Sequence, residues 1–315
     1  MPSADDKSSP SKVDAGRAPR NDPLSRLLKA NAARTRSRLT AADRLDALAA
    51  KPADATSRGL VADAKKARHD LATLCPGTVL EDPLGRCYFV EGTIRQLLPH
   101  LADTEKEYCR TFVGGGARTI PRDLHESVRP LAQCDPADIA YLDIETCGMA
   151  GMAVFLVGLL GWRGGNLWVR QYLARDYSEE AAMLAHVWQQ VAIAPVLVTF
   201  NGLAFDVPFI QDRAAVSGLG ARRLESRHVD LLHEARRRWK GILPNCRLQT
   251  LEHFICGRLR LGDIPGDQIP AVYHEFVRTG DARQIQVVLR HNAQDLVTLA
   301  EVAARILLNC DAGLS

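Results

Sequence analysis

The chain has 315 residues, of which 46% are hydrophobic and 24% are charged, and this composition excludes collagen-like, fibrous and wholly disordered proteins. The net charge is only +3, but residues 1–70 hold 15 of the 40 Lys and Arg residues and only 9 of the 37 Asp and Glu residues. The basic excess therefore lies in the N-terminal segment, and the rest of the chain is slightly acidic.

The cysteines and the apolar runs indicate where the protein resides. Eight cysteines are spread along the chain without a CxxC pair, which is typical of reduced thiols. The first twelve residues lack the apolar run of a signal peptide. The longest apolar run, Met149 to Trp162, is shorter than the roughly 20 residues of a membrane span and indicates a buried strand. We therefore expect a cytoplasmic protein without a membrane anchor.

Residues 1–70 are expected to form a basic N-terminal segment. Residues 1–22 combine Ser, Pro, Lys, Asp and Arg with few large apolar side chains, which predicts disorder. From Leu24 to Leu48, leucines recur among Arg and Lys at roughly helical spacing, which indicates a basic helix. Both a phosphate-contacting or partner-docking arm and a solvated helix or linker fit this pattern.

Residues 71–135 are expected to form a small accessory region. The stretch GTVLEDPLGRCYFVEGTI reads as two strands joined by a Pro-Leu-Gly turn, which predicts a hairpin. The glycines 114–116 lack the Lys-Ser/Thr of a phosphate-binding loop, so we interpret them as a flexible connector.

Residues 136–312 are expected to form the main domain. Three strands (IAYLDIE, AVFLVGLLGW and NLWVRQYL) precede a helix (SEEAAMLAHVWQQVAI), and a fourth strand (VLVTF) follows it. A short strand, RHVDLL, and further helical patterns extend to about residue 308. Three strands that can meander, followed by alternating helices and strands, predict an α/β fold with a mixed sheet flanked by helices.

Two acidic residues of the first of these strands lie two positions apart. Asp143 and Glu145 therefore project to one face of the strand, while Leu142 and Ile144 project to the other. Two carboxylates placed side by side repel one another unless a cation neutralises them, which favours a hard divalent metal ion. Two surface acids at the end of a strand would show the same spacing.

A third acidic residue follows the VLVTF strand. Asp206 is placed in the first turn of the next helix, with Phe205 and Phe209 spaced to face the core. In α/β sheets, sites form outside the carboxyl ends of parallel strands, where Asp143 and Glu145 also lie if the strands are parallel. An ordinary acid stabilised by the helix dipole is the alternative for Asp206.

A fourth group lies on the last helix. His291 and Asp295 are four residues apart and share one helix face, while Leu289, Leu296 and Leu299 can pack inward. The alternative is a surface His/Asp pair. The combination of DxE on a strand, NGxxFD after a strand and HNxxD on a late helix favours a common site.

These three motifs resemble those of the DnaQ-like (DEDD) 3′-5′ exonucleases of the ribonuclease H-like superfamily, and the chain is most similar to the YprB-type ribonuclease H-like domain. The similarity covers roughly residues 136–310. It includes HVDLLHEARRRWKGILPNCRLQTLE, followed by DIPG and IP before the last motif.

The resemblance implies a metal centre and its ligands. Asp143, Glu145, Asp206 and Asp295 would hold two Mg²⁺ or Mn²⁺ ions, and one of these would activate the attacking water. His291 corresponds to a position that is Tyr four residues before the last Asp, or His five residues before it, in the exonucleases. It would be a general base or a supporting residue.

Other polar residues near the motifs are candidates for substrate binding. Asn201 and Asn292 could hydrogen-bond the nucleic-acid backbone or hold a carboxylate in place. Arg236 and Arg237 belong to a basic run that could contact phosphates or form a solvated helix face. Asp230 on the preceding strand is interpreted as structural.

The resemblance implies metal-dependent hydrolysis of phosphodiester bonds, with a 3′-5′ exonuclease acting on single-stranded DNA or RNA ends as the main hypothesis. A module that binds nucleic acid with little or no hydrolysis is the first alternative, because the third motif departs from both exonuclease patterns. A structure-specific endonuclease is the second.

Overall fold

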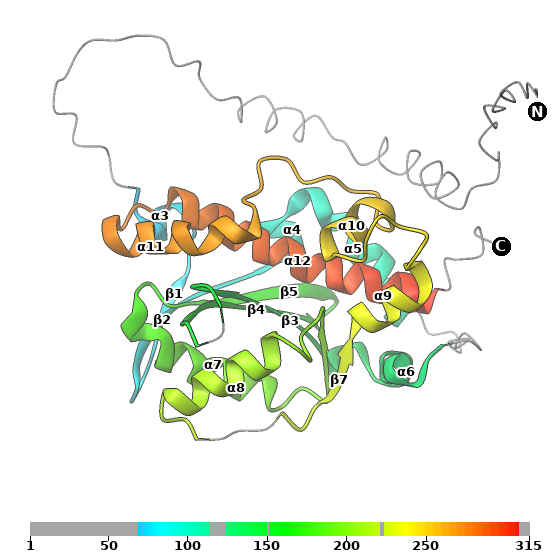
Figure 1. The fold of residues 1–315 in the computed structure, drawn as a ribbon, viewed down its shortest axis with the longest axis horizontal. Coiled ribbons are helices and arrows are strands. Elements are labelled where there is room, and N and C mark those ends of the chain that lie inside the picture. The colour runs from blue at the N-terminus through cyan, green and yellow to red at the C-terminus, as the bar shows by residue number, and fades with distance from the viewer. Residues whose placement is uncertain (1–68, 114–123, 150, 221–223, 309–315) are drawn as a thin grey trace, which may run out of the picture.

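A computed structural model describes residues 69–113, 124–149, 151–220 and 224–308. Its centre is a seven-stranded mixed sheet with the strand order β1-β2-β5-β4-β3-β6-β7 (Figure 1). The strands are β1 (Thr78–Asp82), β2 (Gly85–Thr93), β3 (Ile139–Thr146), β4 (Val154–Arg163), β5 (Asn166–Leu173), β6 (Val196–Thr199) and β7 (Arg227–Asp230). Helices flank both faces, so the predicted α/β fold is confirmed.

The predicted hairpin between residues 71 and 135 is present as β1 and β2, which pair antiparallel. β2 also pairs antiparallel with β5 along six residues, from Tyr88 opposite Leu173 to Thr93 opposite Trp168. The accessory region therefore extends the central sheet. The glycine triplet and the expected N-terminal basic helix lie outside the described residues.

The sheet is mixed because its connections differ. β3, β4 and β5 follow one another as an antiparallel meander. The connections from β3 to β6 and from β6 to β7 lead to parallel pairs, and helices precede β6 and β7. The carboxyl ends of β3, β6 and β7 therefore meet at one edge, where ligand sites of such sheets usually form.

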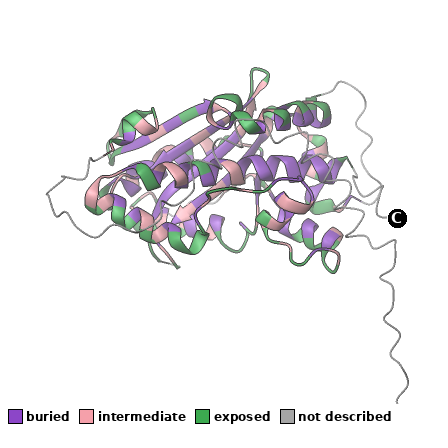
Figure 2. Cartoon of the chain, turned by 90° about the horizontal axis from the view of Figure 1, so that it is seen from above, coloured by how far each residue is buried: buried purple, intermediate pink, exposed green. Residues whose placement is uncertain are grey.

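Two helical layers cover the sheet (Figure 1). The layer below it in that view holds α7 (Glu180–Val191) and α8 (Asp206–Val216). The long helix α12 (Arg283–Leu307) crosses the other face and is buried along much of its length (Figure 2). The remaining α-helices are α3 (Leu71–Leu74), α4 (Ile94–Leu97), α5 (Ala102–Tyr108), α6 (Arg129–Gln133), α9 (Leu231–Trp239), α10 (Leu248–Phe254) and α11 (Ile269–Thr279).

The alternation of β3 determines which layer each side chain meets. Leu142 and Ile144 pack in the core cluster that contains the apolar residues of α7, whereas Tyr141 packs with the residues of α12. Asp143 and Glu145 share the face of Tyr141 because they lie two and four positions after it. Both acids therefore face α12.

A glycine of β4 allows α12 to approach the sheet closely. A Cβ atom at Gly158 would lie 2.1 Å from Oδ1 of Asn292 and 2.8 Å from a methyl carbon of Leu296. Asn292 is fully buried, and its Oδ1 accepts a hydrogen bond from Gln171 at 2.8 Å. The amide group has no room to withdraw, so a side chain at position 158 would push α12 away from the sheet.

Replacing Gly158 by alanine is expected to lower the free energy of unfolding by about 1–3 kcal/mol, because the added methyl group overpacks this contact. Gly161→Ala on the same strand is the matched control, since its Cβ would approach no atom closer than 3.7 Å. Urea denaturation of both variants measures the difference. Equal losses for the two variants would contradict the close approach.

Neither disulfides nor membrane spans are found in the described part of the chain. Seven of the eight cysteines lie there and are free. No helix among the described residues combines the length and apolar character that a bilayer span requires.

Candidate active site

The first two acidic residues lie at the carboxyl end of β3, as the sequence predicts. Asp143 and Glu145 are both half-buried, and their neighbours on the strand are buried. The Nδ2 group of Asn292 on α12 donates hydrogen bonds to Oδ2 of Asp143 at 2.9 Å and to its backbone oxygen at 3.2 Å. Of the two roles that the sequence allows for Asn292, contact with the nucleic-acid backbone or holding a carboxylate, these contacts favour the second.

The third acidic residue approaches β3 from the next strand. Asp206 begins α8 and is buried. The backbone N–H of Ile144, between the two acids of β3, is among the groups that lower the pKa of its carboxyl, although burial outweighs them. The expectation for Phe205 is wrong: its side chain is 41% exposed, because it precedes the helix with non-helical backbone angles, whereas Phe209 is buried.

The loop that presents Asp206 is fixed by Asp230 at the end of β7. The carboxylate of Asp230 accepts hydrogen bonds from the backbone N–H groups of Asn201, Leu203 and Leu232, at 2.8, 3.1 and 3.0 Å. Asn201 has φ of +66°, a left-handed conformation that Asn tolerates better than most residues. The structural role predicted for Asp230 is confirmed.

Replacing Asp230 by alanine is expected to lower the free energy of unfolding by about 2–4 kcal/mol, because three backbone donors lose a charged acceptor. Asp230→Asn keeps one acceptor oxygen and should cost less. Thermal or urea unfolding of the two variants measures this order, and a smaller loss for alanine than for asparagine would contradict it.

The third motif places His291 and Asp295 beside the acids of β3. Nε2 of His291 lies 3.3 Å from Oδ2 of Asp295 and 3.9 Å from Oε1 of Glu145. Its Nδ1 lies 2.8 Å from Oδ1 of Asp263. His291 is buried, so the predicted juxtaposition of the histidine with the acids is present.

Two residues that the sequence did not assign complete the cluster, Arg260 and Asp263. Both lie in the loop between α10 and α11. Arg260 donates to Oδ1 of Asp295 and, through Nε at 2.5 Å, to Glu252. Its Nη1 also lies 3.4 Å from Asp263. Asp263 is the first residue of the DIPG stretch, and this motif is the sequence feature that could have identified it as part of the site.

Burial and mutual repulsion raise the pKa values of three acids in the cluster. Burial is the main cause of the increase for Asp143, whose pKa lies well above its ordinary range, and the charges of Asp295, Glu145 and Asp206 add to it. Burial likewise raises the pKa of Glu145 to about 8 and that of Asp206 to about 7. Each ionised acid is therefore destabilised by its surroundings.

Asp295 and His291 behave differently because they are paired. Burial alone would raise the pKa of Asp295, but Arg260 and His291 outweigh it and hold that pKa below its ordinary value. Burial would lower the pKa of His291, but hydrogen bonds with Asp263 and Asp295 outweigh it and raise the pKa to about 11. His291 is thus cationic when no metal ion is bound.

The donor set fits a hard divalent cation. Four acids influence one another's ionisation, and carboxylate oxygens are the ligands that Mg²⁺ and Mn²⁺ prefer. Within the described ranges, no three His, Cys, Asp or Glu side chains are already arranged to hold a metal ion together. Asp295 contacts Arg260, and Asp143 accepts from Asn292.

A cavity of about 330 Å³ lies beside Arg260. Its lining includes Arg258, Leu259, Arg260 and Asp263 from the loop, and His253 from α10. The two residues predicted to contact phosphates, Arg236 and Arg237, are exposed on α9, and Arg237 donates to Glu234 at 2.8 Å. They do not line this cavity.

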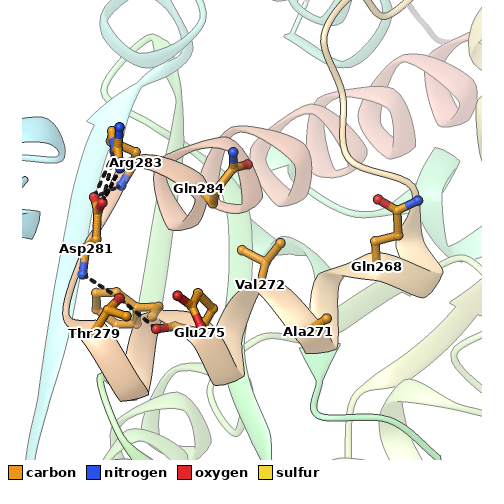
Figure 3. Close-up of a pocket in the computed structure, with 9 residues that line it drawn as sticks. Gln268, Ala271, Val272, Glu275, Thr279, Asp281, Arg283 and Gln284 are labelled. Carbon is orange, nitrogen blue, oxygen red and sulfur yellow. Dashed lines mark hydrogen bonds and ion pairs between the residues drawn. The ribbon is translucent and has the colours of Figure 1, made fainter. Parts of the chain in front are cut away.

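A cavity of about 720 Å³ lies away from the acids, between α11 and the start of α12 (Figure 3). Asp281 and Arg283 form an ion pair at its rim, and Val272 and Gln284 face into it (Figure 3). None of the four candidate metal ligands lines this cavity, so its size does not bear on the acidic cluster.

The chain matches a family model and one curated protein. A family model described as the RNase_H superfamily matches residues 140–307, which is more than half of the chain. The uncharacterized protein YprB of Bacillus subtilis (strain 168) is 34% identical over 166 residues. This match covers 51% of the chain and 40% of that relative, so the chain corresponds to less than half of the relative's length.

A solved structure was also matched. The family B DNA polymerase from the hyperthermophilic archaeon Pyrobaculum calidifontis is 18% identical, with a TM-score of 0.43, over 54% of this chain and 24% of the polymerase. This degree of likeness carries no conclusion about substrate or activity.

Proposed function

Since the chain belongs to the RNase_H superfamily, we propose that it is a divalent-metal-dependent nuclease, most specifically a 3′-5′ exonuclease that acts on single-stranded ends of DNA or RNA. The observation that carries this proposal is the proximity of acids from β3, α8 and α12, because the charges of Asp295, Glu145 and Asp206 all raise the pKa of Asp143. Such a cluster is costly for folding alone and is suited to binding a cation.

The metal ligands in this proposal are Asp143, Glu145, Asp206 and Asp295, the set that the resemblance to the exonucleases implies, with Mg²⁺ or Mn²⁺ as the bound ion and two ions at full occupancy. A bound ion would activate water and stabilise the charge on the leaving oxygen. Asn292 holds the carboxylate of Asp143.

His291 is the proposed proton acceptor. Asp263 binds its Nδ1, so its Nε2 is directed toward the acids. Asp263, Asp295 and Glu145 together raise the pKa of this imidazole, so it can accept a proton only when a bound cation offsets these acids and lowers the pKa toward neutrality. We expect His291→Asn to reduce the rate constant of cleavage by about a hundredfold, with little effect on binding of oligonucleotide.

Substrate contacts outside the acidic cluster are assigned to exposed residues. Asn201 is exposed in the loop that leads to Asp206, and Arg236 and Arg237 are exposed on α9. Contacts of arginines with phosphates would make binding weaken with added salt.

One observation favours a second candidate function, a nucleic-acid-binding module with little hydrolysis. Both carboxylate oxygens of Asp295 already contact protein donors, Arg260 and His291. A cluster neutralised in this way needs fewer cations and would hydrolyse slowly.

An oligonucleotide labelled at its 5′ end tests these functions. Incubation with Mg²⁺ or Mn²⁺ should produce a ladder shortened from the 3′ end. Discrete internal fragments would indicate an endonuclease instead, and binding without cleavage would favour the module. Parallel DNA and RNA substrates identify the sugar preference.

A further inference from the structure

The loop between α10 and α11 has an inverted polarity. Arg258 and Arg260 are buried or nearly so, whereas the alternating residues Leu259 and Leu261 are 67% and 65% exposed. Burying two arginines while exposing two leucines is unfavourable unless the buried charges are paired. The inward direction of Arg260 is therefore determined by the acids that it meets.

Arg260 is held at the acidic cluster from several sides. Its side chain is 8% exposed. Nε donates to Glu252 at 2.5 Å, Nη1 lies 3.4 Å from Asp263, and Nη2 donates to Asp295. Glu252 is itself buried and also lies 3.5 Å from Arg258. The guanidinium group is thus fixed in position before any ligand binds.

Asp295 is occupied by this arrangement. Arg260 contacts its Oδ1, and Nε2 of His291 lies 3.3 Å from its Oδ2. To bind a cation, Asp295 would have to exchange a buried ion pair for a metal bond. The cation would also experience repulsion from the guanidinium group beside it.

We propose that Arg260 supplies the second positive charge of this centre, in the place of a second metal ion, so that the centre binds one divalent cation tightly through Asp143, Glu145 and Asp206. This inference rests on the proposed nuclease function and revises two of its details, the second ion and the place of Asp295 among the metal ligands. Asp295 then acts as the anchor of Arg260.

The chemistry of a guanidinium group suits this role. Arg260 uses three of its five N–H groups in contacts with Glu252, Asp263 and Asp295 among the described residues. A guanidinium group is a rigid planar fork of N–H donors that matches phosphate oxygens, a geometry that a hydrated metal ion does not provide. A phosphate bound to the cation at β3 would find a second positive group beside it.

Counting bound Mn²⁺ on the full-length chain tests the inference without relying on activity. Electron paramagnetic resonance reports the free ion during a titration. We expect wild type to bind one ion, with a second at least about a hundredfold weaker because of the adjacent charge. In Arg260→Gln the second ion should bind within about tenfold of the first.

Three further proteins make this count specific. Arg260→Lys keeps the charge and should bind one ion tightly, as wild type does. Arg175→Gln is the matched control, because Arg175 is also ion-paired with a buried glutamate, Glu179, but does not contact the cluster. It should leave the count unchanged. Asp143→Asn should lose the tight ion.

Two results would overturn the inference. Wild type that binds two Mn²⁺ ions with similar affinities would contradict it, even if Arg260→Gln fails to fold. A count of one in folded Arg260→Gln would contradict it as well. Tight binding that survives in Asp143→Asn would instead contradict the ligand set of the proposed function, so the two failures are distinguishable.

Discussion

Replacing Asp143 by asparagine is expected to reduce the rate of oligonucleotide hydrolysis at least about a thousandfold. Asp143 lies close to the other acids, since the charges of Asp295, Glu145 and Asp206 all raise its pKa. Asparagine has the same shape but cannot supply the negative charge that a divalent cation requires. It keeps an oxygen that can accept from Asn292, which holds the aspartate at 2.9 Å, so we expect the fold to be retained.

The matched control for this loss is Asp212→Asn. Asp212 is exposed on α8, the helix that Asp206 begins. The substitution therefore removes the same charge, but from the surface. Its activity should stay within about twofold of wild type, since surface substitutions are usually nearly neutral. The initial rate of release of a labelled product, with the melting temperature of each variant, measures both effects. Cleavage by Asp143→Asn at the wild-type rate would show that the acidic cluster does not take part in hydrolysis.

The parts of the site that sequence could predict are those that follow local rules. The two-residue spacing of Asp143 and Glu145 fixes their common face, because side chains alternate along a strand. The four-residue spacing of His291 and Asp295 fixes theirs on a helix. The parallel arrangement of the last strands then places Asp206 at the same edge.

Arg260 and Asp263 could not be placed in this way. They lie in a loop without a helix or strand period, and their partners Asp295 and His291 are about thirty residues further along the chain. From residue type alone, Leu259 and Leu261 would be expected to face the core and Arg260 to face solvent. In the structure the two leucines are exposed instead. Only the three-dimensional pairing of charges reverses that assignment.

The pairing of the hairpin with β5 is a similar case. The turn residues predict that β1 pairs with β2, because the two strands are adjacent in sequence. The alternation of β2 does not specify which distant strand meets its other edge. Tyr88 opposite Leu173 and Phe89 opposite Tyr172 become neighbours only when the meander of β3 to β5 exposes β5 as an edge.

The stability of the metal-free protein is expected to fall as pH rises from about 5 to about 8. Glu145 and Asp206 have folded-state pKa values of about 8 and about 7, above their ordinary values of 4.5 and 3.8. The folded state therefore holds protons that the unfolded state releases, and its advantage is present at low pH and lost as pH rises through the folded pKa values. A divalent cation competes with these protons, so it should stabilise the protein more at pH 8 than at pH 6.

Glu145→Gln separates this effect from general ion binding. Glutamine removes a buried charge at nearly constant size, so the metal-free variant should be more stable than wild type at pH 8, by about 1–3 kcal/mol. The same variant should lose most of the increase in melting temperature that Mn²⁺ gives wild type. These two shifts have opposite signs because one charge both destabilises the empty cluster and binds the cation. If the variant is less stable than wild type without metal at pH 8, Glu145 stabilises the metal-free fold. That result would contradict the interpretation of the cluster as a cation-binding site.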